Sequence, residues 1–338
     1  MALRRHEQPE LWREFAEADD RVITQVDDGH PVGEDAGTAG TSAADAPGVV
    51  ATMLRQLQVY GGERVLEIGT GTGWIAALLA HRLGADRVTS IEIDTETAAR
   101  ARKSLSDTGY GGVRVVTGDG ASGYPQEAPY HRVIATAACS RIPYSWVAQT
   151  RRGGRIVAPS CALDYCGLLL ALTVIENGSD NRDDNGTAIG YAIGQASFMR
   201  MRDQRLDPRD EVFISTGDEE SRASVRETFL RPADVGDDGA VIAIGTRVPR
   251  CRMDYLPSPE RNSSNGTLRL VDHNSRSCAR LYYEEGSLGP YPVHQYGPRN
   301  LWDEVEAAHT WWVEHGSPGA DRWRFTVTRE GQRIDLAG

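Results

Sequence analysis

The sequence has few cysteines and no long apolar segment. Its five cysteines are scattered and form no Cys-x-x-Cys pair: Cys139, Cys161, Cys166, Cys251 and Cys278. This scatter argues against a structural zinc site, so we expect free thiols that pack as small apolar residues and no bound metal. No apolar run approaches the ~20 residues that cross a bilayer, and the start of the chain lacks the apolar stretch of a signal peptide. We therefore expect a soluble, cytoplasmic protein without a membrane partner.

Positive charge is also in short supply. The 37 Lys and Arg residues face 48 Asp and Glu residues, which gives a formal net charge of −11 at pH 7. A protein that binds nucleic acid through its phosphates needs a surplus of basic side chains along one face. The acidic balance therefore argues against a nucleic-acid partner. The apolar content of 40% is that of a globular protein, and the length suffices for one large or two ordinary domains.

Three regions of the chain differ in their patterning. Residues 1–40 are polar and broken by glycine, so apart from a short helix predicted over 10–18 we expect an N-terminal arm. Residues 41–178 alternate short apolar strands with helices, which predicts a doubly wound, parallel α/β sheet. A polar, turn-rich loop at 176–186 ends this region. In residues 187–338 the alternation is lost, and we expect an additional α+β domain with a substrate-binding or accessory role.

The spacing of apolar residues locates the individual elements. A helix is predicted from Pro47, followed by strands at 64–68, 87–93, 113–117, 130–136, 155–159 and 167–175 and by helices at 74–83, 96–106 and 143–149. Farther along, strands are predicted at 240–244, 267–271 and 324–328, and a helix at 301–315. Four of the seven tryptophans lie after residue 300. We expect them to fill the core of the second domain; the alternative is that some line a peptide groove.

A glycine-rich turn, Gly69-Thr70-Gly71-Thr72-Gly73, follows the first of these strands. Glycine lets the backbone approach a ligand closely, and the helix that follows presents free N–H groups. The pattern differs from the Gly-x-Gly-x-x-Gly that suits a pyrophosphate, and no Lys-Ser/Thr pair follows it. Glu67, just before the turn, is poorly placed beside a phosphate anion. The turn is therefore better suited to a cationic ligand, or to one whose polar end is an amino acid.

Two more acidic residues are predicted at the same edge of the sheet. Glu92 ends the next strand, where its carboxylate can accept both hydroxyls of a ribose. Asp119 follows the third strand within Gly118-Asp119-Gly120, where it can accept a hydrogen bond from an adenine amino group. The carboxyl ends of consecutive parallel strands are where open α/β sheets bind ligands. For each acid alone, the alternative is a helix cap or a solvated turn.

These segments resemble the S-adenosylmethionine motifs of class I methyltransferases and, within them, the protein L-isoaspartyl O-methyltransferase family. The matching segments are 65–74, 91–94, 116–120, 130–134, 136–138 and 153–159. The resemblance implies a Rossmann-like sheet and S-adenosylmethionine as the cofactor. It implies that Glu67 and the glycines hold the methionyl part, Glu92 the ribose and Asp119 the adenine. The full set of expected cofactor contacts is Glu67, Gly69, Thr70, Gly71, Gly73, Glu92, Ile93, Gly118, Asp119, Gly120 and Ala138.

The segment before the first helix of the sheet departs from that family. Its members carry a Thr-x-Ser-x-Pro-like segment that places a hydroxyl beside the methyl-accepting carboxylate, whereas Asp45 stands at the serine position here. A second carboxylate repels an acceptor carboxylate, or shares a proton with it. Alternatively, Asp45 caps the helix and Thr41 or Ser42 supplies the hydroxyl. The candidate catalytic residues are therefore Asp45, Ser42 and Thr41, and catalysis would depend mainly on positioning.

Residues 187–338 are a second departure, because repair enzymes of the family end near the doubly wound part. Asp45 and this extension resemble actinobacterial members that methylate an aspartyl side chain in ribosomally made peptides, such as lanthipeptides and ester- or amide-crosslinked peptides. There the next backbone nitrogen displaces the methyl ester to give a succinimide, which can open to isoaspartate. Ser275-Arg276-Ser277 and Arg299 are candidates for binding an acidic peptide, with a structural role as the alternative.

The resemblance therefore implies a carboxyl O-methyltransferase that acts on a peptide or protein, with a cyclised ribosomal precursor peptide as the expected substrate. Two rival functions stay open. One is general repair of isoaspartate in damaged proteins. The other is cofactor binding without catalysis, in which the C-terminal region docks a partner. Dehydrogenation with a nicotinamide cofactor is disfavoured by the Gly-x-Gly-x-Gly pattern and by Glu67.

Overall fold

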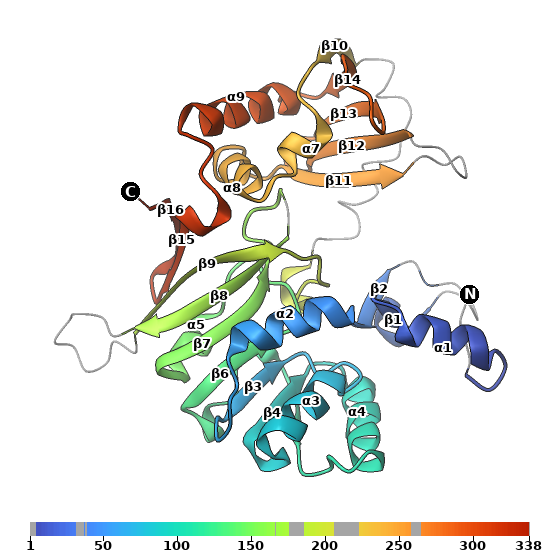
Figure 1. The fold of residues 1–338 in the computed structure, drawn as a ribbon, viewed down its shortest axis with the longest axis vertical. Coiled ribbons are helices and arrows are strands. Elements are labelled where there is room, and N and C mark those ends of the chain that lie inside the picture. Colours follow the sequence, from blue (N-terminus) through green and yellow to red (C-terminus); the bar gives the residue numbers. More distant parts are fainter. Residues whose placement is uncertain are drawn as a thin grey trace.

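The body of the molecule is a nine-stranded sheet (Figure 1). The computed structural model describes residues 5–31, 37, 39–165, 167–175, 186–205, 223–257 and 265–337. The strands of the large sheet are β3 (Val65–Ile68), β4 (Val88–Glu92), β5 (Arg114–Thr117), β6 (Tyr130–Ala135), β7 (Thr150–Ser160), β8 (Leu168–Ile175), β9 (Thr187–Gln195), β15 (Trp323–Thr328) and β16 (Gly331–Leu336). Their order is β16-β15-β9-β8-β7-β6-β3-β4-β5. The strands from β7 to β5 are parallel, and those from β8 to β16 extend the sheet in antiparallel fashion.

Helices cover both faces of the parallel half, which confirms the predicted doubly wound sheet. They are α2 (Pro47–Leu57), α3 (Trp74–Leu83), α4 (Thr95–Asp107) and α5 (Tyr144–Ala148). Side chains from α2 and α3, such as Met53 and Leu79, form one apolar cluster with alternate strand residues such as Val65. Leu66 and Trp146 belong to the cluster of the opposite face. Because successive residues of a strand point to opposite faces, the short apolar strands supply both cores.

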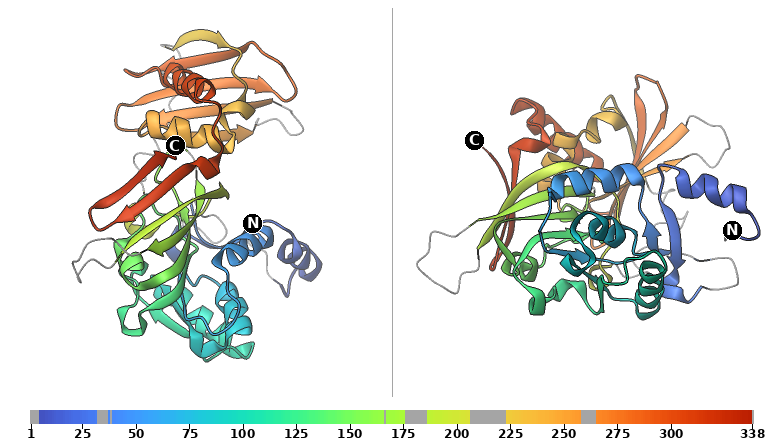
Figure 2. Two further views of the ribbon diagram at one scale, coloured as in Figure 1. Left: turned by 60° about the vertical axis from the view of Figure 1, so that its left-hand side comes forward. Right: turned by 60° about the horizontal axis from the view of Figure 1, so that its bottom comes forward.

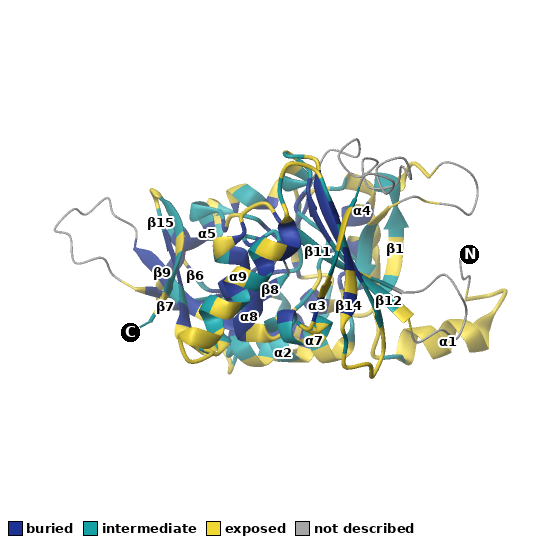
Figure 3. Cartoon of the chain, turned by 90° about the horizontal axis from the view of Figure 1, so that it is seen from above, coloured by how far each residue is buried: buried dark blue, intermediate teal, exposed yellow. Residues whose placement is uncertain are grey.

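The N-terminal arm consists of the helix α1 (Pro9–Glu17) and the hairpin β1 (Val22–Val26) and β2 (Gly40–Ala44). No residue of α1 is buried, and the helix is coloured as exposed along most of its length in Figure 3. The arm is connected to the body through α2, because the Gly48 N–H donates to Asp19 Oδ1 at 2.7 Å. The helix predicted over 10–18 is thus confirmed, and the arm borders the first helix of the body.

The C-terminal region contains a second, antiparallel sheet of five strands, in the order β10-β14-β13-β12-β11. Its strands are β10 (Ser224–Thr228), β11 (Arg252–Pro257), β12 (Asn265–Asp272), β13 (Ser277–Glu284) and β14 (Tyr291–Tyr296). The helices α7 (Pro232–Val235), α8 (Asp238–Arg247) and α9 (Leu301–Glu314) accompany it. Trp302 on α9 is fully buried. An additional α+β domain with Trp302 in its core is therefore confirmed. The expectation for the other three tryptophans holds only in part, because Trp311 and Trp312 are half-buried and Trp323 belongs to β15 of the large sheet. Short 3₁₀ turns occur at Asp27–Gly29, Ala85–Arg87, Gly120–Ser122, Pro125–Glu127, Arg202–Gln204 and Ala320–Arg322.

The strand predicted at 240–244 is wrong, because these residues lie inside α8. The Asp237 side chain caps this helix by accepting from the N–H groups of Gly239 and Ala240. Every residue from Gly239 to Gly245 is buried, so the helix is surrounded by apolar partners and has no polar face. A short apolar run of this kind shows neither a helical nor a strand period, which is why the sequence pattern misled.

The border between the two regions also differs from the expected one near residue 187. Strand β9 and the final hairpin β15–β16 belong to the large sheet, with Phe325 paired to Gly190. In Figure 2 the red strands β15 and β16 accordingly lie beside the green strands, although the second sheet precedes them in the chain. The chain therefore leaves the large sheet, builds the smaller one and returns. Most of the predicted loop, at residues 176–185, lies outside the described residues.

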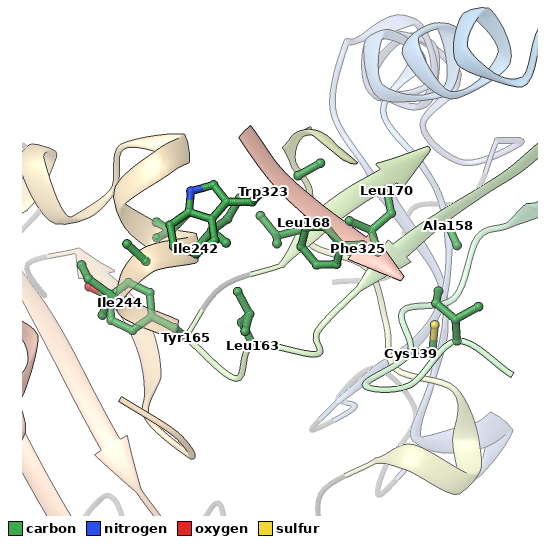
Figure 4. Close-up of a cluster of buried hydrophobic side chains, with 14 of the residues drawn as sticks. Cys139, Ala158, Leu163, Tyr165, Leu168, Leu170, Ile242, Ile244, Trp323 and Phe325 are labelled. Atoms are coloured by element: carbon green, nitrogen blue, oxygen red, sulfur yellow. The ribbon is translucent and has the colours of Figure 1, made fainter. Parts of the chain in front are cut away.

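One apolar cluster runs from the large sheet into the C-terminal region (Figure 4). It joins Leu168 and Leu170 of β8 to Phe325 of β15 and to Ile242 of α8. Packing at this junction is tight, since a Cβ added at Gly245 would lie 2.7 Å from Cβ of Leu163. The two regions thus share a core, although each has its own sheet.

The part of the chain that the structure describes bears on membrane spans, metal ligands and thiols. No helix there is long and apolar enough to span a bilayer. In the same residues no group of three His, Cys, Asp or Glu side chains is arranged to hold a metal ion. Cys139, Cys161, Cys251 and Cys278 are buried free thiols, as expected of packing residues, and Cys166 lies outside the described residues.

Candidate functional site

A pocket lies where the carboxyl ends of β3 and β4 and the start of the turn after β5 meet the N-terminal arm. Its sheet side is formed by Ile68, Gly69, Gly71, Ile91, Glu92, Ile93, Asp94, Asp119, Gly120, Thr136 and Ala137. The opposite side is formed by Arg21, Gln25, Thr41, Ser42, Ala43 and Asp45 of the arm, together with residues 197–202 and Arg205. Six of the predicted cofactor residues and all three candidate acceptor residues therefore line one cavity.

The glycine turn brings the two sides of the pocket close together. Gly71 has a left-handed backbone with φ of +55°, which favours glycine. A Cβ at this position would lie 3.6 Å from the backbone oxygen of Ala43 and 3.8 Å from Oγ of Ser42. These are ordinary van der Waals distances, so the left-handed backbone, and not a lack of space, favours glycine at a turn that lies against the acceptor strand of the arm.

Glu92 is held in the pocket wall by backbone donors. The Gly71 N–H donates to its Oε2 at 2.9 Å, and the Asp94 N–H donates to its Oε1 at 3.1 Å. The residue is 9% exposed. Each carboxylate oxygen has more than one acceptor site, so both keep capacity for a further donor such as a ribose hydroxyl. Its neighbour Ile93 also lines the pocket.

Asp119 lines the pocket beside Gly120. Its Oδ1 accepts from the Ala121 N–H at 2.9 Å and so fixes the carboxylate at the turn after β5. A Cβ at Gly120 would lie 2.5 Å from Cγ2 of Ile68, so the close approach of this turn to β3 requires glycine. Both acids predicted at strand ends are therefore in the pocket wall.

Five of the predicted cofactor residues lie behind that wall, and do not line the pocket: Glu67, Thr70, Gly73, Gly118 and Ala138. Gly73 precedes α3, and a Cβ there would meet Leu105 at 3.2 Å. The Gly118 N–H donates to the Glu92 backbone oxygen at 2.9 Å. Ala138 exchanges backbone hydrogen bonds with Met199 and Met201. These contacts indicate that the five residues support the residues that line the pocket.

Glu67 is the most distinctive of these supporting residues. It is fully buried, its Oε2 accepts from the Ser90 hydroxyl at 2.5 Å, and Ser90 in turn shares a hydrogen bond with Thr70 at 2.6 Å. Its Oε1 has no partner among the described residues. Burial and, to a smaller extent, the negative charge of Glu92 raise the pKa of Glu67 to about 8, although the hydrogen bond from Ser90 opposes the rise. At neutral pH this carboxyl is therefore largely protonated beneath the glycine turn.

The three candidate acceptor residues all line the pocket, but their side chains differ in availability. The Thr41 hydroxyl donates to Gln25 Oε1 at 3.1 Å and accepts from the Asp28 N–H at 3.0 Å. The Ser42 hydroxyl accepts from Thr24 Oγ1 at 3.2 Å. Thr41 thus holds the hairpin together, while Ser42 is the hydroxyl closer to the glycine turn.

The structure excludes the alternative that Asp45 caps the following helix. The N-cap residue of α2 is Ala46, and no side chain at that position accepts a hydrogen bond from the helix. The Gly48 N–H instead donates to Asp19. Burial raises the pKa of Asp45 to about 6, and the charge of Arg21 partly offsets this rise. Asp45 is therefore an acidic side chain of the pocket that titrates near neutral pH.

Arginines from distant parts of the chain were not anticipated as part of the site. Asp28 of the arm binds Arg202 at 3.0 Å and Arg205 at 2.7 Å, and Arg202 also lies 3.7 Å from Asp94. These contacts hold residues 197–205, which follow β9, over the arm and the end of β4. No motif or spacing in the sequence marks them, because the ion pairs join residues that only the tertiary fold brings together.

The C-terminal residues proposed for peptide binding have structural partners instead. Arg299 bonds Glu304 and the almost fully buried Asp272, the latter at 2.7 Å. These contacts raise the pKa of Arg299 above its ordinary value. The Arg299 N–H also donates to Ser277 Oγ at 3.0 Å. Neither Arg299 nor Ser277 lines the pocket. For both residues the structure supports the alternative of a structural role over a role in peptide binding.

Comparison with known proteins decides the family. The model of the family described as Protein-L-isoaspartate(D-aspartate) O-methyltransferase (PCMT) matches residues 14–176. A protein-L-isoaspartate O-methyltransferase of Methanopyrus kandleri is 39% identical over 188 residues, which are 55% of this chain and 80% of that protein. This chain belongs to the protein-L-isoaspartate O-methyltransferase family.

Other family members match shorter stretches. Protein-L-isoaspartate O-methyltransferase 2 of Archaeoglobus fulgidus is 44% identical over 159 residues, 46% of this chain and 72% of that protein. The enzyme of Methanoculleus marisnigri is 48% identical over 113 residues, 33% of this chain and 50% of that protein. Of five such curated relatives the chain spans only 50% to 65% of the length. The family model covers residues 14–176, which carry the sheet side and the arm side of the pocket.

A solved structure titled protein-L-isoaspartate O-methyltransferase has the same fold over a greater length. It aligns with a TM-score of 0.51 and 18% identity, and covers 96% of this chain and 89% of that chain. At this identity the likeness concerns the fold alone. It nevertheless includes the C-terminal region, so the expectation that this region sets the chain apart from proteins of that name is not supported.

Proposed function

We propose that this chain is an S-adenosylmethionine-dependent carboxyl O-methyltransferase acting on the free carboxylate of an isoaspartyl residue in a protein or peptide. The single observation that carries the proposal is the shared pocket: Glu92 and Asp119 lie on its sheet side, and Ser42 and Asp45 on its arm side. Membership of the family supports the same reaction. Cofactor and acceptor would thus meet across the glycine turn.

The sheet side of the pocket fits this cofactor by its chemistry. Glu92, Asp94 and Asp119 are acceptors and carry negative charge, whereas the cofactor offers hydroxyl and amino donors and a positive sulfonium. The unpartnered Oε1 of Glu67 lies buried beneath the turn as a further acceptor. In this proposal Glu92 holds the ribose and Asp119 the adenine.

The residues of the arm would orient the acceptor. The cofactor, when bound, supplies a methyl group activated for transfer. An isoaspartyl carboxylate is already ionised at neutral pH, so the chain need not remove a proton from it. Ser42 can donate a hydrogen bond to one carboxylate oxygen, because its hydroxyl now only accepts from Thr24. The ion pairs of Asp28 with Arg202 and Arg205 fix the arm that carries Ser42 beside the pocket. The rate enhancement therefore comes mainly from positioning.

A pair of matched peptides tests the proposal. The chain is incubated with cofactor carrying a labelled methyl group and with an isoaspartyl peptide or its normal aspartyl twin. We expect base-labile methyl ester on the isoaspartyl peptide alone. Cofactor binding by calorimetry without label on either peptide would contradict the proposal, and would favour a non-catalytic protein that docks a partner.

Asp45 favours a second candidate substrate, an aspartyl side chain in a ribosomally made peptide. The structure shows this acid in the pocket and not at a helix cap, so its departure from the family serine bears on the acceptor. In this proposal the next backbone nitrogen attacks the ester carbonyl, loses its proton and releases methanol, which closes a succinimide. Label on the aspartyl twin, with loss of methanol and a cyclic product by mass spectrometry, would favour this substrate over the repair substrate.

A further inference from the structure

Arg21 occupies a distinctive place at the mouth of the pocket. It directly precedes β1, and the pairing of Val22 with Ala44 puts Arg21 opposite Asp45 at the open end of the hairpin. Cross-strand neighbours of an antiparallel pair present their side chains on the same face. Both residues line the pocket, and the charge of Arg21 lowers the pKa of Asp45. The hairpin thus presents a cation and an acid together to the acceptor space.

The pocket has four lining arginines, and they differ in how far they are already paired. Three form ion pairs with carboxylates: Arg200 with Asp164 at 3.5 Å, Arg202 with Asp28 at 3.0 Å and Arg205 with Asp28 at 2.7 Å. Within the described residues, the guanidinium of Arg21 takes part in no hydrogen bond or ion pair, and Asp45 is its charged neighbour. Arg21 is therefore the lining arginine whose donors are available.

An anionic acceptor needs such a cation. A carboxylate that enters the pocket approaches Asp45, Glu92, Asp94 and Asp119, and the repulsion from these acids disfavours its binding. Guanidinium groups bind carboxylates through two parallel N–H donors, and each oxygen so bound keeps a lone pair with which to attack. We propose that Arg21 binds the acceptor carboxylate of the substrate and selects an acid over its amide. This inference rests on the proposed methyl transfer to a carboxylate.

Arg21 is also exposed, and its exposure determines how large the preference for the acid over the amide is and how it depends on salt. An ion pair at a pocket mouth is partly screened by solvent, and the screening increases with salt. We therefore expect about a tenfold preference for the acid over the amide at low salt, and a smaller preference at high salt. The negative charge of the neighbouring Asp45 already attracts the guanidinium without a direct ion pair, so it weakens the preference when Asp45 is ionised.

The test uses binding and does not depend on turnover. An isoaspartyl peptide and its isoasparaginyl twin, in which the carboxylate is a carboxamide, are titrated by calorimetry into the full chain saturated with S-adenosylhomocysteine. We expect the unmodified chain to bind the acid about tenfold more tightly, Arg21→Gln to bind both peptides equally, and Arg21→Lys to keep part of the preference. Arg13→Gln is the matched control, since Arg13 is an exposed arginine of α1 outside the pocket, and it should keep the full preference.

The outcomes separate this inference from the proposed function. If Arg21→Gln keeps the preference for the acid, Arg21 does not bind the acceptor. If Arg21→Gln loses affinity for S-adenosylhomocysteine as well, Arg21 shapes the pocket and the inference is again overturned. Absence of both peptide binding and methyl transfer in the unmodified chain would instead reject the proposed function. Circular dichroism spectra of the variants show whether they are folded, and the partial preference of Arg21→Lys supports the charge itself.

Discussion

The two sides of the pocket are built in different ways. On the sheet side, β3 and β4 are buried along their whole length, and apolar clusters hold them from both faces. On the arm side, α1 buries no residue, and the hairpin is held by polar contacts such as Asp28 with Arg205 and Asp19 with Gly48. The proposed cofactor site is therefore part of the apolar core of the sheet. The proposed acceptor site instead depends on the polar contacts that attach the arm to the body.

The largest effect is expected from Glu92→Ala on the sheet side. The variant removes a carboxylate that two backbone N–H groups orient toward the pocket. Loss of its hydrogen bonds to a ribose should weaken cofactor binding about 100-fold, or roughly 3 kcal/mol. Calorimetry with S-adenosylhomocysteine measures this, and Glu96→Ala on the exposed surface of α4 is the control. An unchanged dissociation constant would show that Glu92 does not hold the cofactor.

The buried acid of the same side should make stability depend on pH. Because burial raises the pKa of Glu67 to about 8, the folded chain keeps a proton there that the unfolded chain, with an ordinary pKa near 4.5, releases. The free energy of unfolding should therefore fall by roughly 4 kcal/mol as the pH rises from about 5 to about 8. Glu67→Gln, which carries no titratable group, should lack this part of the fall. Urea unfolding at several pH values compares the two proteins, and parallel curves would contradict the prediction.

On the arm side, Asp45→Asn should change how acceptor binding depends on pH. The pKa of Asp45 is about 6, so the side chain is neutral at pH 5 and charged at pH 8, whereas the acceptor carboxylate is ionised at both. Repulsion should raise the KM of the unmodified chain for its peptide about tenfold between these values.

Asp45→Asn should keep a low KM throughout, with cofactor affinity unchanged, and Asp45→Ser restores the residue of the family. If Asp45→Ser and Asp45→Ala both behave exactly like the unmodified chain at every pH, Asp45 has no part in acceptor binding.

The smallest effect is expected at the attachment of the arm. Asp19→Ala removes the acceptor for the Gly48 N–H at the start of α2 and should cost about 1 kcal/mol of stability. Hydrogen exchange at the Gly48 amide should become faster, while amides of β3 stay protected. Glu14→Ala, also exposed and on the arm, serves as the control. Slow exchange of the Gly48 amide in Asp19→Ala would mean that the hydrogen bond between Gly48 and Asp19 does not attach the arm to α2.

The parallel half and its two acids at strand ends were predictable because the signals there are local. A short apolar strand is followed by the glycine turn from Gly69 to Gly73, and an acid lies at the end of each of the next two strands. Topology alone therefore places Glu92 and Asp119 at one edge of the sheet. The position of Glu67 was predictable too, but its burial was not. That burial depends on how closely the glycine turn packs over Ser90, which no local pattern encodes.

The contacts that hold the arm side of the pocket were much less predictable from the sequence. The sequence suggested Thr41, Ser42 and Asp45 but contained no sign that Asp19 caps α2 or that Arg202 and Arg205 close over Asp28. Such contacts depend on tertiary arrangement and not on spacing. The same reason explains α8, whose uniform apolar environment hides its helical period.

The return of the chain to the large sheet has a consequence for its synthesis. The outer edge of β9 pairs with β15, which is made only after the whole second sheet has emerged from the ribosome. Until then, the backbone groups of β9 on that side have no strand partner, and an unpaired edge promotes association with other chains. Nascent chains that stop between residues 200 and 320 should therefore aggregate or recruit chaperones, whereas release of the last hairpin closes the sheet beside β9.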